Sequence, residues 1–224
     1  MEAMTVEQII EAYWKIQGYW TITRFPFKVA KKRKNRKNNS GWSDIDILAY
    51  NPIKKELVIC ESKVRKKKNA LLGVSNGNVG DYLGDFKTNT INFLNGDEIQ
   101  KLVDFKSVDK VTIQFVGNVF WDDKKDNKQN VTKKMENGIK NKVKNRLKSK
   151  IEFQIHSTFD ILCKIIEIER NNEQGKRYGH PVLDIVREMN RYMINRNKGK
   201  EYIKEFLCAM GYQSFEMRNG DRTQ

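Results

Sequence analysis

The sequence has few of the residues that build disulfides or histidine-based metal sites. It contains three cysteines, Cys60, Cys163 and Cys208, which are far apart and include no Cys-x-x-Cys pair. An odd and scattered set of cysteines argues against a disulfide framework or a zinc knuckle and favours a reducing compartment. The two histidines, His156 and His180, have no Cys, Asp or Glu at metal-ligand spacing, so we expect structural or surface roles for both.

Long apolar runs and a nucleotide-binding loop are also absent from the sequence. No stretch approaches the roughly 18 apolar residues of a membrane span. The segment MEAMTVEQII carries an early acid and no apolar signal region. The Gly-rich run GVSNGNVG (73–80) lacks the Gly-Lys-Ser/Thr ending of a P-loop, which favours a flexible strand-to-helix connection. We therefore expect a cytoplasmic protein with no membrane partner.

Acidic residues are missing between Glu11 and Asp44, although the whole chain has 28 of them. Lys and Arg total 43, which gives a formal net charge of +15. Clustered bases can neutralise a phosphate backbone and release its counterions, although a solubilising surface is the alternative and composition does not separate the two. The bases that we expect to contact nucleic acid are Lys31, Lys32, Arg33, Lys34, Arg36, Lys37, Arg65, Lys66, Lys67 and Lys68.

Hydrophobic periodicity predicts an α/β chain with a helix-rich C-terminal part. The polar segment 30–41 is predicted as a loop because Lys and Asn dominate it. The expected elements are a helix at 6–16, strands at 19–27, 42–50 and 56–64, a helix through 82–93, a strand at 111–121, a helix at 133–149, a strand at 151–155, and helices near 158–170, 181–196 and 200–210.

This order, α-β-β-β-α-β, predicts a mixed central sheet flanked by helices. We expect a core over residues 1–156 and a helical C-terminal extension over 157–224 that packs on it, with 171–180 as the best hinge candidate. In the last clear helix, Met189 and Met193 join an apolar stripe. That stripe serves either core packing or a homodimer contact.

The strands 42–50 and 56–64 carry four charged residues that an antiparallel hairpin would bring together. With the turn centred on residues 51–56, facing residues have numbers that sum to 107, so Asp46 lies opposite Glu61 and Asp44 opposite Lys63. Because side chains alternate along a strand, these four are expected on one face. The residues expected on the other, core-facing side are Ile45, Ile47, Val58 and Cys60.

Two carboxylates that face each other across strands repel by about 4 kcal/mol at 4 Å, taking an effective dielectric constant near 20. A bound divalent cation supplies a reason for such a pair. Mg²⁺ takes one or two carboxylates and completes its shell with water and phosphate oxygens, and Mn²⁺ accepts similar ligands. It also activates water and stabilises charge on a phosphate. Lys63 would contact the same phosphate or orient the attacking water.

The pattern SDIDILAY (43–50), followed by a turn and a strand that ends in Glu61-Ser62-Lys63, resembles the active-site hairpin of the PD-(D/E)XK nuclease superfamily. The resemblance covers roughly residues 5–120. Ser43 stands where the motif has Pro, and Asp46 fits the metal-ligand position better than Asp44. The resemblance therefore implies Asp46 as the principal ligand and Asp44 as an auxiliary one.

The same resemblance implies a fourth residue and a function. Resolvase-like members place a helix glutamate upstream of the hairpin, and Glu7, eleven residues before Gly18, matches it. The implied catalytic set is Asp46, Glu61, Lys63 and Glu7 in a restriction-endonuclease-like core. The implied activity is Mg²⁺-dependent endonuclease cleavage of double-stranded DNA, of a restriction or defence type. Alternatives are a Holliday-junction or repair nuclease, an RNA-directed nuclease and a non-catalytic DNA-binding module.

Overall fold

The computed structural model divides the chain into two compact units, Met1–Ile165 and Ile166–Gln224. The domain boundary expected between residues 156 and 157 stays a prediction. The residues that the structure describes are 3–33, 36–63, 72–75, 78–79, 81–102, 107–117, 119–121, 128–143, 150–171 and 179–195.

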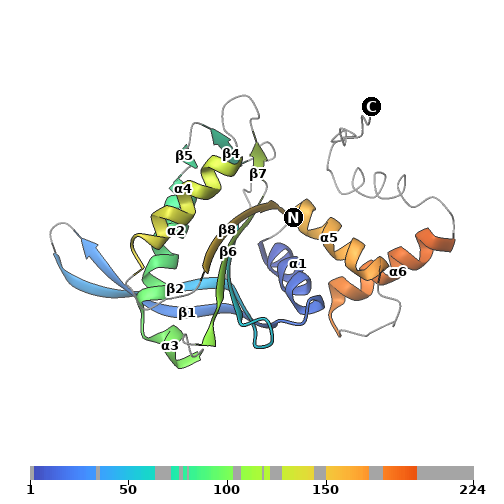
Figure 1. Ribbon diagram of the computed structural model, residues 1–224, viewed down its shortest axis with the longest axis horizontal. Helices are drawn as coiled ribbons and strands as arrows, with labels where there is room; N and C mark the ends of the chain where they lie inside the picture. Colours follow the sequence, from blue (N-terminus) through green and yellow to red (C-terminus); the bar gives the residue numbers. More distant parts are fainter. Residues whose placement is uncertain are drawn as a thin grey trace. The chain divides into compact units, whose positions relative to one another are not determined.

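A mixed five-stranded sheet forms the centre of the first unit (Figure 1). The strand order is β1-β2-β3-β6-β8, with antiparallel pairing from β1 to β3 and parallel pairing from β3 to β8. The α/β class and the mixed sheet flanked by helices are therefore confirmed. The strands are β1 (Trp20–Arg33), β2 (Arg36–Asn51), β3 (Glu56–Lys63), β6 (Lys110–Gly117) and β8 (Lys150–Ser157).

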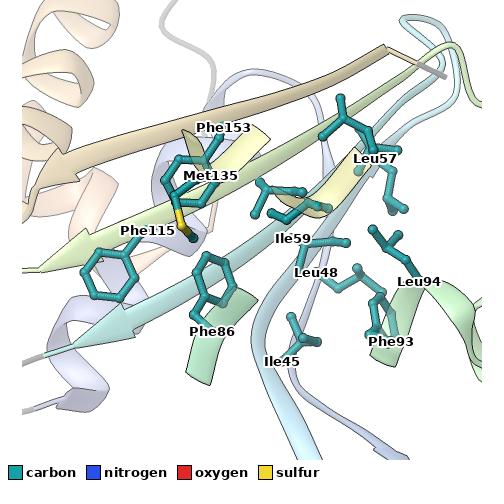
Figure 2. Close-up of a cluster of buried hydrophobic side chains, with 14 of the residues drawn as sticks. Ile45, Leu48, Leu57, Ile59, Phe86, Phe93, Leu94, Phe115, Met135 and Phe153 are labelled. Carbon is teal, nitrogen blue, oxygen red and sulfur yellow. The ribbon is translucent and has the colours of Figure 1, made fainter. Parts of the chain in front are cut away.

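The main hydrophobic core lies on one face of this sheet, between the strands and the helices α2 (Asp81–Asn95), α3 (Glu98–Leu102) and α4 (Lys128–Lys140). Alternate residues of the strands point into it, and Figure 2 shows them beside the helix side chains. Cluster members labelled in Figure 2 are Ile45, Leu48, Leu57, Ile59, Phe86, Phe93, Leu94, Phe115, Met135 and Phe153.

The other face of the sheet is covered by α1 (Ala3–Ile16), the helix that the sequence predicts at the start of the chain. Its apolar residues Val6 and Ile10 are fully buried. Trp14 Nε1 donates a hydrogen bond of 3.1 Å to Oε1 of Gln114, a residue of β6 whose neighbours Ile113 and Phe115 point into the main core. Helix α1 therefore lies on the face opposite α2 and α4.

The predicted loop at residues 30–41 is wrong where the backbone is described. Strands β1 and β2 continue as a paired ribbon as far as Arg33 and Arg36, and the ribbon extends beyond the other strands in Figure 1. Lys and Asn have low strand propensity, which favoured a loop. Pairing of the two strands satisfies their backbone groups regardless of that propensity.

A second sheet of three strands, in the order β5-β4-β7, was not predicted. It consists of β4 (Leu72–Ser75), β5 (Asn78–Val79) and β7 (Val119–Trp121). The first two strands fall in the segment predicted as a connection. The third shows that the strand predicted at 111–121 is two strands in different sheets. Strands of two to four residues leave too little periodicity to detect.

The helices α5 (Thr158–Arg170) and α6 (Pro181–Asn195) confirm two predicted elements. The boundary between the two units falls within α5. In the second unit, Arg187 Nε donates to Glu169 Oε1 at 2.6 Å, and Asn190 Nδ2 donates to the carbonyl of Ile166 at 3.3 Å. The helix predicted at 200–210 lies outside the described residues. Over the part of the chain that is described, no helix is both long and apolar enough for a membrane span.

Candidate active site

The hairpin of β2 and β3 has the predicted register and then separates. Its pairs run from Asn51 with Glu56 to Ile47 with Cys60, and the numbers of every pair sum to 107 as expected. Within the described β2 and β3, the ladder stops there, one residue before Asp46 and Glu61. The two residues that were expected to face each other therefore lie where the strands begin to part.

Asp46 bridges this separation with its side chain. Its Oδ2 accepts hydrogen bonds from the backbone N–H of Ser62 at 2.7 Å and from Ser62 Oγ at 3.0 Å. Burial raises the pKa of Asp46, the two bonds from Ser62 oppose this, and the negative charges of Glu7 and Asp44 raise the pKa further. Asp46 thus has a structural contact that the sequence did not reveal.

Glu61 carries the largest electrostatic cost of the group. Burial raises its pKa to about 8, and the neighbouring charge of Asp46 contributes in the same direction. Lys63 Nζ lies 3.7 Å from Glu61 Oε1 and partly offsets the shift, while Asp44 adds to it. At neutral pH, Glu61 therefore holds a proton in most molecules unless another positive charge approaches.

Glu7 joins the cluster from α1, as the resemblance implies. It is held by a residue that the sequence analysis missed: Arg24 Nε donates to Glu7 Oε2 at 3.1 Å, and Arg24 Nη2 donates to Glu7 Oε1 at 3.3 Å. Hydrogen bonding to Glu7 and its charge raise the pKa of Arg24, with smaller contributions from Asp46 and Asp44. Arg24 is thus the counter-ion of this group of carboxylates.

Arg24 also marks an irregularity in β1. It lies between the ladder pairs Thr23–Ile47 and Phe25–Ile45, which places it across from Asp46, and its φ of +52° is in the left-handed region. An L-residue there costs about 1 kcal/mol. The place of Arg24 follows from the β1–β2 register, which no turn signal in the sequence fixes.

The expectation that all four hairpin residues share one face is wrong. Ile45 and Leu48 both belong to the main core cluster (Figure 2). Two residues three apart in one strand cannot share a face under strict alternation, so β2 changes face between them. Asp44, next to Ile45, points away from the cluster, whereas Glu61 follows Ile59 on the cluster side of β3. The charges come together because the strands part at Asp46.

These carboxylates have the donor chemistry of a Mg²⁺ site, since Mg²⁺ prefers oxygen ligands. Asp46 and Glu61 could supply two ligands, with Glu7 and Asp44 beside them. In the described residues, however, no three His, Cys, Asp or Glu side chains are placed together as a metal-binding group. Each of three carboxylates instead has a contact within the protein: Asp46 with Ser62, Glu61 with Lys63 and Glu7 with Arg24.

The predicted nucleic-acid contacts fall largely outside the described side chains. The backbone of Lys31, Lys32 and Arg33 lies in β1, and that of Arg36 and Lys37 lies in β2. Lys34 and residues 65–68 lie outside the described residues altogether. Further along the same ribbon, the exposed side chains of Lys28 and Trp42 form a cross-strand pair.

Comparisons with known proteins add little to this geometry. No protein-family model matches the chain, and no curated protein matches it. A crystal structure of a protein of unknown function, AF1548, is similar at 9% sequence identity, with 82% of this chain and 96% of that chain covered and a TM-score of 0.35. A likeness at this level carries no argument about function.

Proposed function

We propose that this chain is a Mg²⁺-dependent endonuclease with a restriction-endonuclease-like core that hydrolyses DNA phosphodiester bonds. The supporting observation is the coupling of acidic residues from three distant segments through Asp46. The charges of Glu7 from α1 and of Asp46 from β2 act on each other, and the charge of Asp46 raises the pKa of Glu61 from β3. Mn²⁺ would substitute for Mg²⁺. Double-stranded DNA as partner and a restriction or defence role belong to the proposal.

The electrostatic cost of these neighbouring carboxylates argues for a bound cation. Glu61 is largely buried and its pKa of about 8 reflects burial and like charges, which destabilise its ionised form. Structural ion pairs do not need such an arrangement, whereas perturbed carboxylates gather at functional sites. A divalent cation would lower the cost by neutralising Asp46 and Glu61 together.

Each residue of the chain has a distinct part in the proposed reaction. Asp46 and Glu61 would hold the cation, which when bound activates water and stabilises charge on the scissile phosphate. Lys63, with its side chain about 41% exposed, can reach a phosphate oxygen while it remains beside Glu61. Arg24 keeps Glu7 in place and adds a positive charge at the site.

Cleavage assays test the proposal directly. Supercoiled plasmid, linear duplex, single strands, a four-way junction and RNA are incubated with the protein in Mg²⁺ or in chelator. Cleavage of a DNA substrate in Mg²⁺, lost in chelator and in Asp46→Asn, supports a nuclease. Preference for the junction would indicate a resolvase, and cleavage of RNA alone would indicate a ribonuclease. No cleavage of any substrate would exclude the proposed activity.

Binding of DNA without cleavage is the second candidate. The net charge of +15 favours a phosphate-rich partner whether or not a reaction follows. The described residues also contain no three His, Cys, Asp or Glu side chains placed together as a metal-binding group. Tight DNA binding that neither requires nor responds to divalent cations would favour this candidate.

A further inference from the structure

Two exposed side chains form a pair on the β1–β2 ribbon, close in sequence to the candidate site. Lys28 and Trp42 face each other in the ladder, and Lys28 Nζ lies 5.6 Å from the centre of the Trp42 ring. Trp42 is 67% exposed. A cation–π contact of this kind orients the indole, and the exposed part of the ring stays open to a ligand.

The pair lies on the same face of the ribbon as Asp44. Phe25, Phe27 and Ile45 belong to the main core cluster, so the residues that alternate with them point to the other side. Lys28, Trp42 and Asp44 are all among these outward residues, and all three are exposed. Trp42 is only two residues before Asp44, which couples electrostatically to Asp46 and Glu61.

The charge around this pair favours an anionic ligand. No acid occurs from Ala12 to Ser43, a segment that includes all of β1 and the ribbon half of β2 up to the site. An indole offers a flat surface on which any nucleobase can stack, and an adjacent ammonium suits the phosphate that follows the base. The combination matches a single nucleic-acid strand, since bases inside a duplex are already stacked on both faces.

We propose that Lys28 and Trp42 form a stacking platform for an unpaired base of single-stranded DNA next to the cleavage site. This proposal rests on the proposed nuclease function and names its substrate class, which is DNA with an unpaired base. A duplex substrate would have to present an unpaired base at the platform. Stacking on one aromatic side chain accounts for about a tenfold change in affinity.

Fluorescence anisotropy with a labelled single-stranded oligodeoxynucleotide in chelator tests the platform. Trp42→Ala should weaken binding about tenfold, whereas Trp42→Phe should stay within about threefold of the parent because it keeps an aromatic ring. Lys28→Gln should flatten the dependence of log K on log salt by about 0.7. Trp20→Ala is the matched control: Trp20 is 72% exposed, but its ladder partner Tyr50 packs against the main core, so it lies on the opposite face.

Three further probes decide the interpretation. The same strand with abasic sites should bind the parent and Trp42→Ala equally, and a duplex of the same sequence should show less than a threefold difference. Equal losses in Trp42→Ala and Trp20→Ala, or no loss in either, would overturn the platform. A loss on an RNA strand without one on DNA would overturn the assignment to DNA. Because chelator prevents cleavage, a failed nuclease assay would leave the binding difference standing.

Discussion

Two glutamates on β3, five residues apart, have pKa values that shift in opposite directions. Glu56 and Glu61 are similarly buried, with side chains 11% and 14% exposed. Burial alone would raise the pKa of Glu56, but hydrogen bonds from Thr112, Tyr19 and Lys110 outweigh it and lower the pKa. At Glu61, burial and the charge of Asp46 act together and raise the pKa to about 8.

The difference separates a well-compensated carboxylate from a strained one. The Tyr19 hydroxyl donates to Glu56 at 2.6 Å and the Lys110 ammonium lies 3.1 Å away, so the ionised form of Glu56 is well compensated. Glu61 lies among like charges, and its Lys63 contact at 3.7 Å does not cancel them. Carboxylates with raised pKa values gather at functional sites, and this is why Glu61 and not Glu56 belongs to the proposed site.

When each of the two glutamates is replaced in turn, the largest expected effect is on the rate of DNA cleavage. Glu61→Gln keeps the shape of the side chain but removes a charged oxygen that would hold the cation. Cleavage should fall by at least about 100-fold. Glu56→Gln is the matched control, and it should cleave at close to the parental rate at a temperature where it is folded. Initial rates on plasmid DNA measure both, and an active Glu61→Gln protein would remove Glu61 from the site.

The stabilities of the same two variants should change in opposite directions. At pH 7 in chelator, Glu56→Gln should lower the free energy of unfolding by about 2 kcal/mol, because a buried charged acceptor of several hydrogen bonds is lost. Glu61→Gln should raise it by about 2 kcal/mol, because the parent must protonate Glu61 when it folds and the neutral amide needs no proton. Urea denaturation measures both. Destabilisation by Glu61→Gln would mean that Glu61 makes a favourable structural contact.

The pH dependence of stability sharpens the contrast. The pKa of Glu61 is about 8 in the folded protein against 4.5 ordinarily, so the folded state binds the proton more tightly. Its contribution to stability is present below pH 4.5 and is lost as pH rises towards 8. The advantage of Glu61→Gln over the parent should therefore vanish below pH 4.5 and grow up to about pH 8. For Glu56, whose pKa is lowered, stability is lost instead as pH falls below 4.5.

The smallest expected effect concerns Arg24. Asn tolerates the left-handed backbone better than Arg, and the lost ion pair is exposed on the Arg24 side, so Arg24→Asn should leave the midpoint of urea denaturation close to that of the parent. Removal of a positive charge beside Glu7 and Asp46 should strengthen binding of Ca²⁺ about threefold in the absence of DNA. Calorimetric titration measures this affinity. Weaker binding would show that Arg24 organises Glu7 for the cation.

The sequence predicts the main elements well where periodicity is strong. The register of β2 and β3 followed from the length of the turn, and the positions of α1, β3 and β8 followed from alternating or helical apolar residues. Propensity failed for the charged ribbon, where pairing between the two strands overrides the preferences of Lys and Asn. It also failed for the short strands of the second sheet, whose order depends on contacts distant in sequence.

The sequence names the members of the candidate site, whose role stays a prediction, but gives less of its geometry. Glu7 was named from the family resemblance and from its place beside the apolar stripe of the first helix, and its charge acts on Asp46. Two features could not be predicted: the change of face between Ile45 and Leu48, and the hydrogen bond from Ser62 to Asp46. A pattern of alternating side chains does not show where two paired strands separate. Arg24 could not be predicted because its contact with Glu7 joins β1 to α1, and no local pattern reveals it.

Binding of Mn²⁺ without DNA tests the central claim, a divalent-cation site at Asp46 and Glu61, most directly. Electron paramagnetic resonance of free Mn²⁺ at pH 7.5 compares the parent with Asp46→Asn, Glu61→Gln and the control Glu56→Gln. The account predicts saturable uptake by the parent and the control, and affinity weakened by at least about tenfold in the two site variants. Equal uptake by all four proteins, or none by the parent, would contradict it.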